Sequence, residues 1–254
     1  VMEIGSHNIP ELITFGTDSK FVPTQLLMSK SDNKVLAWGW DIDEKLNQFD
    51  DIKNEDATTT IVREFKSRLG KSEADNNYCS LFLEKIKYQI LDELGVGDEL
   101  KEKDFKTCIG HPETWSDERK ETLKRLTEEA GFPDVELLSE PIAGMHALRV
   151  NANRVKFSAH SEILLVVDFG GGTLDICLFK TKELLRNPRL IGSGGNDALG
   201  GKNFDELIEK RFFKHYIAKF TRSEYSIYNL FRLGENIRDV KERASEEFAE
   251  GGHV

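Results

Sequence analysis

The sequence predicts an α/β fold, and three stretches of its 254 residues carry that prediction. Residues 163–167 are continuously apolar, and a glycine turn separates them from a second, alternating apolar run. Residues 104–148 alternate strand-like and helix-like patterns, whereas residues 72–94 repeat apolar side chains at helical spacing. Chains of this kind form sheets with helices packed on their faces.

The first part of the chain predicts short strands and one long helix. Strand-like segments occur at residues 11–15, 21–28 and 35–40. Residues 41–56 are acidic and polar, which predicts a loop or a surface helix. The helix predicted at residues 72–94 is followed by Gly95, where a helix-ending glycine belongs.

The middle of the chain predicts strand, helix, strand and helix in succession. Residues 104–110 suit a strand, and Ser116 suits the N-cap of a helix that Gly131 ends. Residues 135–138 suit a short strand, and Pro141 suits the first turn of the next helix.

The stretch from residue 163 to residue 180 holds the strongest functional signal. Its apolar run suits a strand buried on both faces, although periodicity alone does not exclude a buried helix. The run ends in a turn made of Asp168, Phe169, Gly170, Gly171, Gly172 and Thr173. Asp175 follows in the alternating residues of a second strand.

This turn has the composition of a phosphate site. Three glycines let a ligand approach the main chain, and the exposed N–H groups of such a turn bind phosphate oxygens. Asp168 and Asp175 flank the turn, and two acids beside a phosphate need a cation such as Mg²⁺. The alternative is a hairpin whose glycines serve only the turn. A kinase Asp-Phe-Gly motif is excluded, because the chain has no His-Arg-Asp loop and no Gly-x-Gly-x-x-Gly loop.

A second glycine-rich loop lies at residues 195–205, before a predicted helix at residues 204–220. It almost matches a P-loop, but Asn196 stands where that motif needs glycine. A polar, basic linker at residues 151–160 separates both glycine-rich segments from the earlier elements.

The last predicted helix covers residues 225–249. Lys241 and Ser245 are spaced i and i+4, so they share one helix face. They can act together on one ligand, or they belong to an ordinary charged amphipathic helix.

Composition narrows the classes of function. Charged residues make up 31% of the chain and hydrophobic residues 39%, as in ordinary globular domains. The net charge of −10 disfavours nucleic acid and anionic membrane surfaces as partners. No apolar stretch approaches the ~20 residues of a membrane span, and residues 1–10 lack the features of a signal peptide.

The three cysteines, Cys79, Cys108 and Cys177, are scattered and lack metal-ligand spacing. Cys108 and Cys177 lie in apolar, strand-like runs, so we expect buried free thiols rather than a disulfide. Free thiols fit a reducing compartment, and we therefore expect a cytoplasmic protein.

Residues 168–175 resemble the second phosphate loop of the actin-like ATPase superfamily, and they are most similar to that of the 70-kDa heat-shock (DnaK-type) chaperones. That loop reads Asp, a hydrophobic residue, three glycines, Thr, a hydrophobic residue and Asp. The resemblance implies an α/β actin-like ATPase fold, which is ribonuclease H-like and has two lobes around a nucleotide cleft. It implies a first lobe at residues 1–160 and a partial second lobe at residues 161–254.

Three further segments resemble the same chaperone family. Lys66, four residues before Gly70, is similar to the family's catalytic lysine. Glu140 and Pro141 match its Asn-Glu-Pro-x-Ala segment. Its Gly-Asp-x-x-Leu-Gly-Gly-x-x-Phe-Asp segment is matched at Gly200, Gly201, Phe204 and Asp205.

The resemblance implies ATP or ADP and Mg²⁺ as ligands. The implied phosphate-binding residues are Gly170, Gly171, Gly172, Thr173, Gly200 and Gly201. Asp168 and Glu140 would hold Mg²⁺ through water, and Lys241 and Ser245 would bind adenosine.

The same resemblance implies the catalytic roles. Lys66 would stabilise the charge of the γ-phosphate, and Glu140 would accept from metal-bound water. Asp175 and Thr173 would orient the attacking water. Residue chemistry alone leaves structural alternatives, in which Lys66 is a solvated surface lysine and Glu140 is an acid that the helix dipole favours. The glycines at 200 and 201 would then belong to a loop that caps the next helix.

The sequence also departs from the family pattern. It lacks the first phosphate hairpin, of the type Gly-Ile-Asp-hydrophobic-Gly-Thr-Thr, and the family's domain continues beyond Val254. We therefore expect a domain truncated at both ends that hydrolyses ATP weakly or not at all. Arg238 stands where the family has an acid, and Glu242 replaces an arginine that stacks on adenine, so adenine binding should weaken.

The first hypothesis is therefore the ATP-binding domain of a chaperone-like ATPase, with nucleotide and client or co-chaperone proteins as partners. The alternative is a non-catalytic protein-interaction module with a degenerate nucleotide site, in which an exposed sheet edge drives dimerisation. A sugar or acetate kinase of the same superfamily is a second alternative. Glu140-Pro141 and the glycines at 200 and 201 favour the chaperone branch over that kinase.

Overall fold

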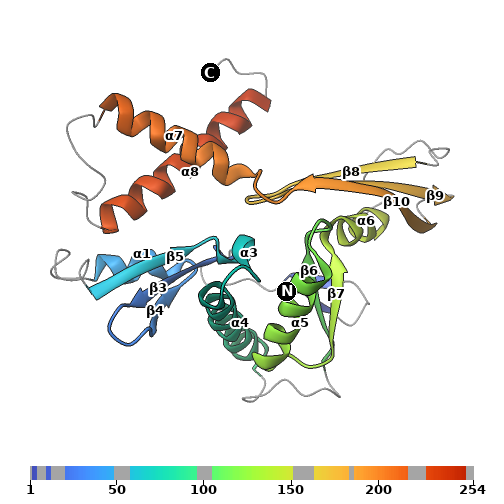
Figure 1. Cartoon of the computed structure of the whole chain (residues 1–254), viewed down its shortest axis with the longest axis horizontal. Coiled ribbons are helices and arrows are strands. Elements are labelled where there is room, and N and C mark those ends of the chain that lie inside the picture. The colour runs from blue at the N-terminus through green and yellow to red at the C-terminus, as the bar shows by residue number, and fades with distance from the viewer. Residues whose placement is uncertain are drawn as a thin grey trace.

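The computed structural model describes residues 2–4, 10–12, 21–48, 58–95, 105–150, 163–182, 186–216 and 227–249. These residues form a mixed α/β structure, as predicted (Figure 1). The elements in chain order are β1 (Met2–Ile4), β2 (Pro10–Leu12), β3 (Gln25–Ser29), β4 (Val35–Trp38), α1 (Asp41–Asn47), β5 (Thr59–Arg63), α3 (Phe65–Arg68), α4 (Glu73–Leu94), β6 (Thr107–His111), α5 (Asp117–Glu129), β7 (Val135–Ser139), α6 (Glu140–Val150), β8 (Ile163–Phe169), β9 (Leu174–Lys182), β10 (Arg186–Asn196), α7 (Gly201–Tyr216) and α8 (Ile227–Ala249).

The described strands form four small sheets. The antiparallel sheets have the orders β4-β3-β5, β10-β9-β8 and β1-β2, whereas β6 and β7 pair in parallel. The linker predicted at residues 151–160, and with it the proposed lobe boundary, lies outside the described residues. In the part of the chain that the structure describes, no helix is long and apolar enough to cross a bilayer.

The largest apolar core joins the β4-β3-β5 sheet to α4 and α5. Leu26, Phe65 and Phe82 are buried in it together with Trp115. The rings of Phe65 and Phe82 meet edge to face with centroids 5.5 Å apart. This core fixes the short helix α3, on which Lys66 lies, against α4.

Of the two alternatives predicted for the acidic segment after β4, a helix is the one that forms, and this helix also contributes to the core. Residues 41–47 form α1, which buries Ile42 and Leu46 beside Leu27 of β3. Phe231 of α8 packs into the same cluster. The last helix therefore contacts the β4-β3-β5 sheet.

The helix ends follow the predicted signals. Ser116 accepts a hydrogen bond from the N–H of Arg119 and caps α5. Gly95 and Gly131 follow α4 and α5 with positive φ angles of 59° and 89°, a conformation that favours glycine. Glu140 is the first residue of α6, so β7 leads directly into that helix.

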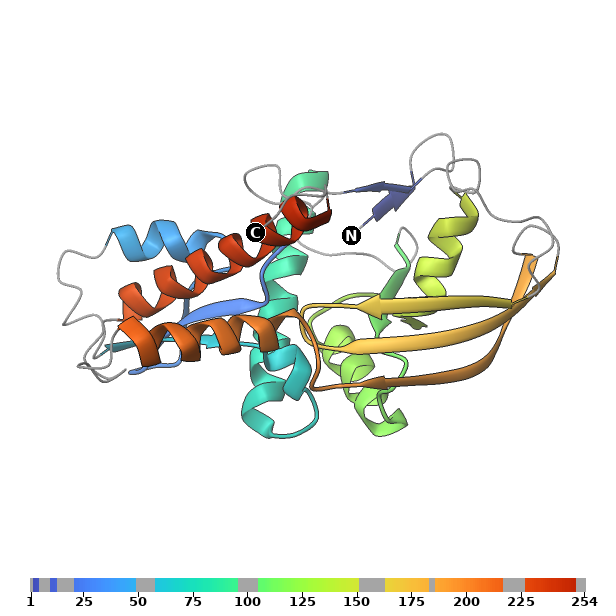
Figure 2. The ribbon, with the colours of Figure 1, turned by 90° about the horizontal axis from the view of Figure 1, so that it is seen from above.

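The prediction that residues 163–167 are buried on both faces is wrong. Along β8 exposure alternates, and Ile163, Leu165 and Val167 are each more than half exposed. The opposite face packs through Val166 against Met145 of α6. Figures 1 and 2 show the reason, because α6 lies along one face of the β10-β9-β8 sheet and no described element covers the other.

The three cysteines are free, as expected. Cys79 and Cys177 are buried, but the predicted burial of Cys108 is wrong. Cys108 lies opposite Glu136 in the two-stranded β6-β7 sheet, and both residues are exposed. That face of the sheet is the one in contact with solvent.

Candidate functional site

The glycine turn between β8 and β9 is closed by a hydrogen bond from Gly170 N–H to the carbonyl oxygen of Thr173 (2.9 Å). Asp168 and Asp175 are direct cross-strand partners at the base of the turn. A Cβ at Gly171 would meet no atom within 4 Å, so the middle of the turn leaves its main chain accessible.

The second glycine-rich loop binds to the first. The N–H groups of Gly201 and Lys202 donate to the carbonyl oxygens of Gly170 (3.0 Å) and Gly171 (2.9 Å). A Cβ at Gly200 would lie 2.6 Å from backbone atoms of Gly172, a distance that no side chain tolerates. Glycine at position 200 is therefore required by the close approach of two main chains, and the start of α7 is fixed beside the turn.

Lys66 and Glu140 form an ion pair beside the two glycine turns. The Lys66 ammonium donates to Glu140 Oε1 at 2.7 Å. The side chains are 51% and 27% exposed, so the pair is in contact with solvent. A Cβ at Gly110 would lie 3.2 Å from Cγ of Glu140, and the absence of a side chain there leaves room for the carboxylate.

Three carboxylates, those of Asp168, Asp175 and Glu140, interact near the base of the turn. Burial raises the pKa of Asp168 above its usual value of 3.8, and the negative charges of Glu140 and Asp175 raise it further. The Lys66 ammonium opposes that rise in pKa. A cation placed among these groups would stabilise their charged forms.

Asp175 is buried, with 1% of its surface exposed. Its Oδ1 accepts a hydrogen bond from the N–H of Thr114 at 3.3 Å. The hydroxyl of Thr114 lies at the same distance from this oxygen. Its Oδ2 is buried without a hydrogen-bond partner among the described residues. The unpaired oxygen is one that a water molecule or another polar ligand would satisfy.

The donor set fits Mg²⁺ held mainly through water rather than by the protein alone. Among the described residues, no three His, Cys, Asp or Glu side chains converge as a direct metal site. Asp168 and Glu140 supply the oxygen chemistry that Mg²⁺ prefers, and this ion keeps several waters and binds through one or two carboxylates.

The last helix reaches the second glycine loop through Lys241 but not through Ser245. The Lys241 ammonium lies 2.7 Å from Asp205 Oδ1 and donates to the carbonyl oxygen of Gly201 (3.3 Å). Ser245 is exposed and donates within the helix to the carbonyl oxygen of Lys241 (2.9 Å). Of this predicted pair, the structure brings only Lys241 to the loop.

A cleft of about 520 Å³ connects these parts. Its lining combines the first glycine turn and the starts of α3, α6 and α7 with one face of α8, where Arg238 and Glu242 both lie. Thr173, Lys66, Glu140 and Gly201 are among its lining residues, whereas Gly200, Asp168, Asp175 and Ser245 are not.

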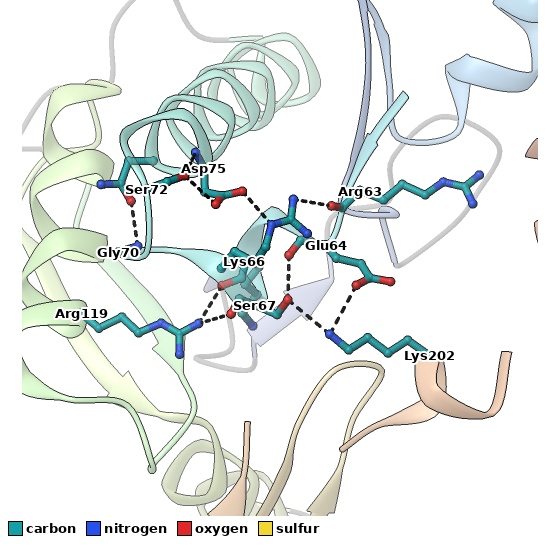
Figure 3. A network of polar contacts seen from close by, with 11 residues as sticks. Arg63, Glu64, Lys66, Ser67, Gly70, Ser72, Asp75, Arg119 and Lys202 are labelled. Carbon is teal, nitrogen blue, oxygen red and sulfur yellow. Dashed lines mark hydrogen bonds and ion pairs between the residues drawn. The ribbon is translucent and has the colours of Figure 1, made fainter. Parts of the chain in front are cut away.

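Ion pairs in and beside this cleft join the C-terminal helices α7 and α8 to earlier elements. They are Lys202–Glu64 (3.4 Å), Glu235–Arg63 (3.6 Å) and Arg232–Asp43 (2.8 Å). Figure 3 shows Lys202 reaching from α7 to Glu64 and to the hydroxyl of Ser67 (3.3 Å). The two sides of the cleft are therefore in contact through side chains.

Sequence reasoning missed Arg119, Asp197, Thr114 and Lys202. Arg119 contacts residues 52 and 78 positions away in the chain, and no short motif identifies such a contact. Only the proximity of Asp197 and Lys202 to the two glycines at 200 and 201 was a signal in the sequence.

Comparison with known proteins gives consistent matches. The family model described as Hsp70 protein matches residues 40–250. The chaperone protein HscA of Buchnera aphidicola subsp. Baizongia pistaciae is 30% identical over 115 residues, which are 45% of this chain and 20% of that protein. The chaperone protein DnaK of Thermoplasma volcanium is 30% identical over 146 residues, 57% of this chain and 22% of that protein. DnaK of Thermosipho melanesiensis is 28% identical over 163 residues, 62% of this chain and 25% of that protein.

The residues that the family model matches include both glycine turns, Lys66 and Glu140. The sequence that forms the candidate site is therefore of the Hsp70 type. The chain belongs to the Hsp70 protein family. Membership confirms the resemblance to the 70-kDa heat-shock chaperones and implies the actin-like ATPase fold. The chain spans about a fifth to a quarter of the length of these curated relatives.

Proposed function

We propose that this chain is the ATP-binding part of a chaperone-like ATPase of the 70-kDa heat-shock type. The observation that carries the proposal is the contact between the two glycine turns beside the Lys66–Glu140 pair. The cleft that they line, about 520 Å³, has the size of a small-molecule site. Family membership supports ATP or ADP with Mg²⁺ as the ligands.

In this proposal residues 170–173 and Gly201, which line the cleft, hold the phosphate groups, and Gly200 allows the close approach of the two turns. Lys66 stabilises charge on the terminal phosphate. Asp168 and Glu140 hold Mg²⁺ through water, and the ion supplies neutralisation of phosphate charge when bound. Lys241, which contacts the loop, belongs to the adenosine side of the site, whereas Ser245 does not line the cleft.

We propose that hydrolysis by this chain is weak or absent. Thr173 and Asp175 are the candidates for orienting water, but Asp175 is buried and already accepts from Thr114. Asp175 does not line the cleft, so its side chain has to move before the unpaired Oδ2 can accept from a water there. Slow turnover is the expected consequence.

The proposal extends to the organisation and setting of the whole protein. We propose two lobes, residues 1–160 and 161–254, which enclose the cleft. The buried free thiols of Cys79 and Cys177 support a reducing, cytoplasmic setting. Client or co-chaperone proteins are the partners that the family suggests.

A thermal melt with Mg·ADP and with Mg·ATP tests the proposal. A ligand at a hundred times its dissociation constant should stabilise the wild type by about 2.7 kcal/mol. In Gly171→Val the shift should vanish, because Gly171 lines the cleft and an added side chain would occupy space there, while its Cβ meets no protein atom within 4 Å. The matched control is Gly192→Val in β10, where a Cβ also meets no atom. Absence of a shift in the wild type would refute nucleotide binding.

The exposed apolar face of the β10-β9-β8 sheet favours a second candidate, a protein-interaction module. We propose that the partner is a second copy of this chain. It would pair with β8, which lies at the edge of its described sheet and carries part of this exposed apolar face. Antiparallel pairing of two β8 strands would place their exposed Leu165 and Val167 side chains next to each other. Such a symmetric contact continues both sheets and closes on itself.

Light scattering on a sizing column separates this candidate from the first. A dimer that Leu165→Lys converts to a monomer would support pairing along β8. The matched control is Tyr88→Lys on α4, which replaces a similarly exposed aromatic side chain away from this sheet. A wild type that stays monomeric at all concentrations would exclude the dimer.

A further inference from the structure

We infer that Arg119 is a positioning residue that fixes Lys66 relative to the two glycine turns. The inference rests on the proposed nucleotide function, in which Lys66 acts on the terminal phosphate. Arg119 does not line the cleft, so it acts through the segments that it holds.

The Arg119 guanidinium is bound from three directions, and Figure 3 shows its contacts with Lys66 and Ser67. Its Nη2 donates to the carbonyl oxygens of Lys66 (3.2 Å) and Ser67 (2.7 Å). Its Nη1 donates to Asp197 Oδ2 at 3.1 Å, and its central carbon lies 3.8 Å from the Trp115 ring centroid. The side chain is 9% exposed, so these contacts take place largely out of water, where they are strong.

The short helix α3 needs such support. It has four residues, begins after Glu64 with a φ of 60° and gives way at Leu69 to extended backbone. The carbonyl oxygens at the end of a helix have few partners within the helix. Arg119 occupies two of them, those of Lys66 and Ser67, and thereby fixes the backbone that carries the Lys66 side chain.

The other end of the contact lies beside the second glycine turn. Asp197 follows β10 and precedes Gly200 by three residues. Its second oxygen accepts from the hydroxyl of Thr114 at 2.5 Å. The N–H of Thr114 donates in turn to Asp175. One chain of hydrogen bonds therefore runs from the Lys66 backbone through Arg119 to the loop before α7 and to the base of the first turn.

Lysine cannot reproduce this arrangement. The planar guanidinium presents several N–H donors in fixed directions and stacks on an aromatic ring, whereas an ammonium is a compact point charge. Arg119→Lys therefore keeps the charge near Asp197 but loses the simultaneous contacts with Lys66 and Ser67. The matched control is Arg125→Lys on the same helix, because the exposed Arg125 side chain pairs with Glu129 of that helix and with no segment of the cleft among the described residues.

Hydrogen exchange without nucleotide tests the positioning directly. Residues 64–71 should exchange about tenfold faster in Arg119→Lys than in the wild type, and the same segment should be unchanged in Arg125→Lys. Equal exchange in the two variants would overturn the inference. This measurement does not depend on nucleotide binding, so it stands even if the proposed function fails.

A double-mutant cycle tests whether the positioning serves ligand binding. Arg119→Lys should weaken Mg·ATP binding about tenfold in the wild-type background and should have little further effect in Lys66→Ala. A loss of the same size in both backgrounds would show that Arg119 acts independently of Lys66 and would overturn the inference. A wild type that binds no nucleotide refutes the proposed function, and the exchange measurement then decides on Arg119 alone.

Discussion

The ammonium of Lys66 lies 2.7 Å from the carboxylate of Glu140, a residue 74 positions later in the chain. The pair joins the short helix α3 to the first residue of α6. Because the Lys66 side chain is half exposed, water screens the attraction, and pairs of this kind contribute about 0–1 kcal/mol to stability. The contact is thus better explained by the cleft that it borders than by the stability of the fold.

Lys66→Ala should separate ligand binding from stability. We expect the melting temperature of the unliganded protein to change little, because the ion pair is exposed. The shift produced by Mg·ATP should decrease strongly. Lys124→Ala is the control, since Lys124 forms an exposed pair with Glu128 on α5. A large loss of unliganded stability in Lys66→Ala but not in the control would contradict the functional role.

Gly200→Ala should destabilise the fold. The new Cβ would lie 2.6 Å from the main chain of Gly172, and such overpacking costs about 1–3 kcal/mol. Gly144→Ala in α6 is the matched change, because a Cβ there meets no atom and alanine favours a helix by about 0.5–1 kcal/mol. Denaturant unfolding of both variants measures the contrast. Equal stability of the two variants would show that the two turns do not approach closely.

Asp168→Asn should stabilise the protein near neutral pH when no metal is present. The folded state raises the pKa of Asp168 above 3.8, so folding favours the protonated carboxyl group. Its ionisation therefore lowers stability as the pH rises through the folded-state pKa. Asparagine removes that loss, and the advantage of the variant should disappear as the pH falls toward 3.8. Melts in EDTA across this range measure the difference, and an advantage independent of pH would refute the electrostatic cause.

Alkylation of the native protein should modify Cys108 first. Burial raises the pKa of Cys79 to about 12 and that of Cys177 to about 11, and both thiols are buried. Cys108 is exposed. Partial desolvation of its thiol and the negative charge of Glu136 also raise its pKa, but solvent and reagent reach it. Mass spectrometry after brief treatment should find one modified cysteine, and three after unfolding. Rapid native labelling of Cys79 would contradict the described core.

Local signals in the sequence predicted the helix ends well. Ser116 caps its helix, and Gly95 and Gly131 adopt the positive φ angles of helix-ending glycines. These effects involve residues within one turn of each other. The motif positions Lys66 and Glu140 also meet, although only the resemblance to a family placed them in one site.

The sequence could not predict features that depend on distant partners. The apolar run of β8 is compatible with one or two covered faces, and the choice depends on which elements pack on the sheet. Arg119 belongs to no motif, and its partners Ser67 and Asp197 lie on different segments. Ser245 shares a helix face with Lys241, yet helical spacing does not reveal where the face ends relative to the cleft.

The close approach at Gly200 determines where the cleft can open. The two glycine turns are joined by main-chain hydrogen bonds without room for a side chain, so α7 and the β8–β9 turn have to move together. The opposite side is joined to α7 and α8 by side-chain ion pairs, among them Arg232–Asp43. Solvent ions screen exposed pairs of this kind. The rates at which a ligand binds and dissociates should therefore depend on ionic strength. Salt should weaken the ion-paired side of the cleft, whereas the two glycine turns stay joined through their main chains.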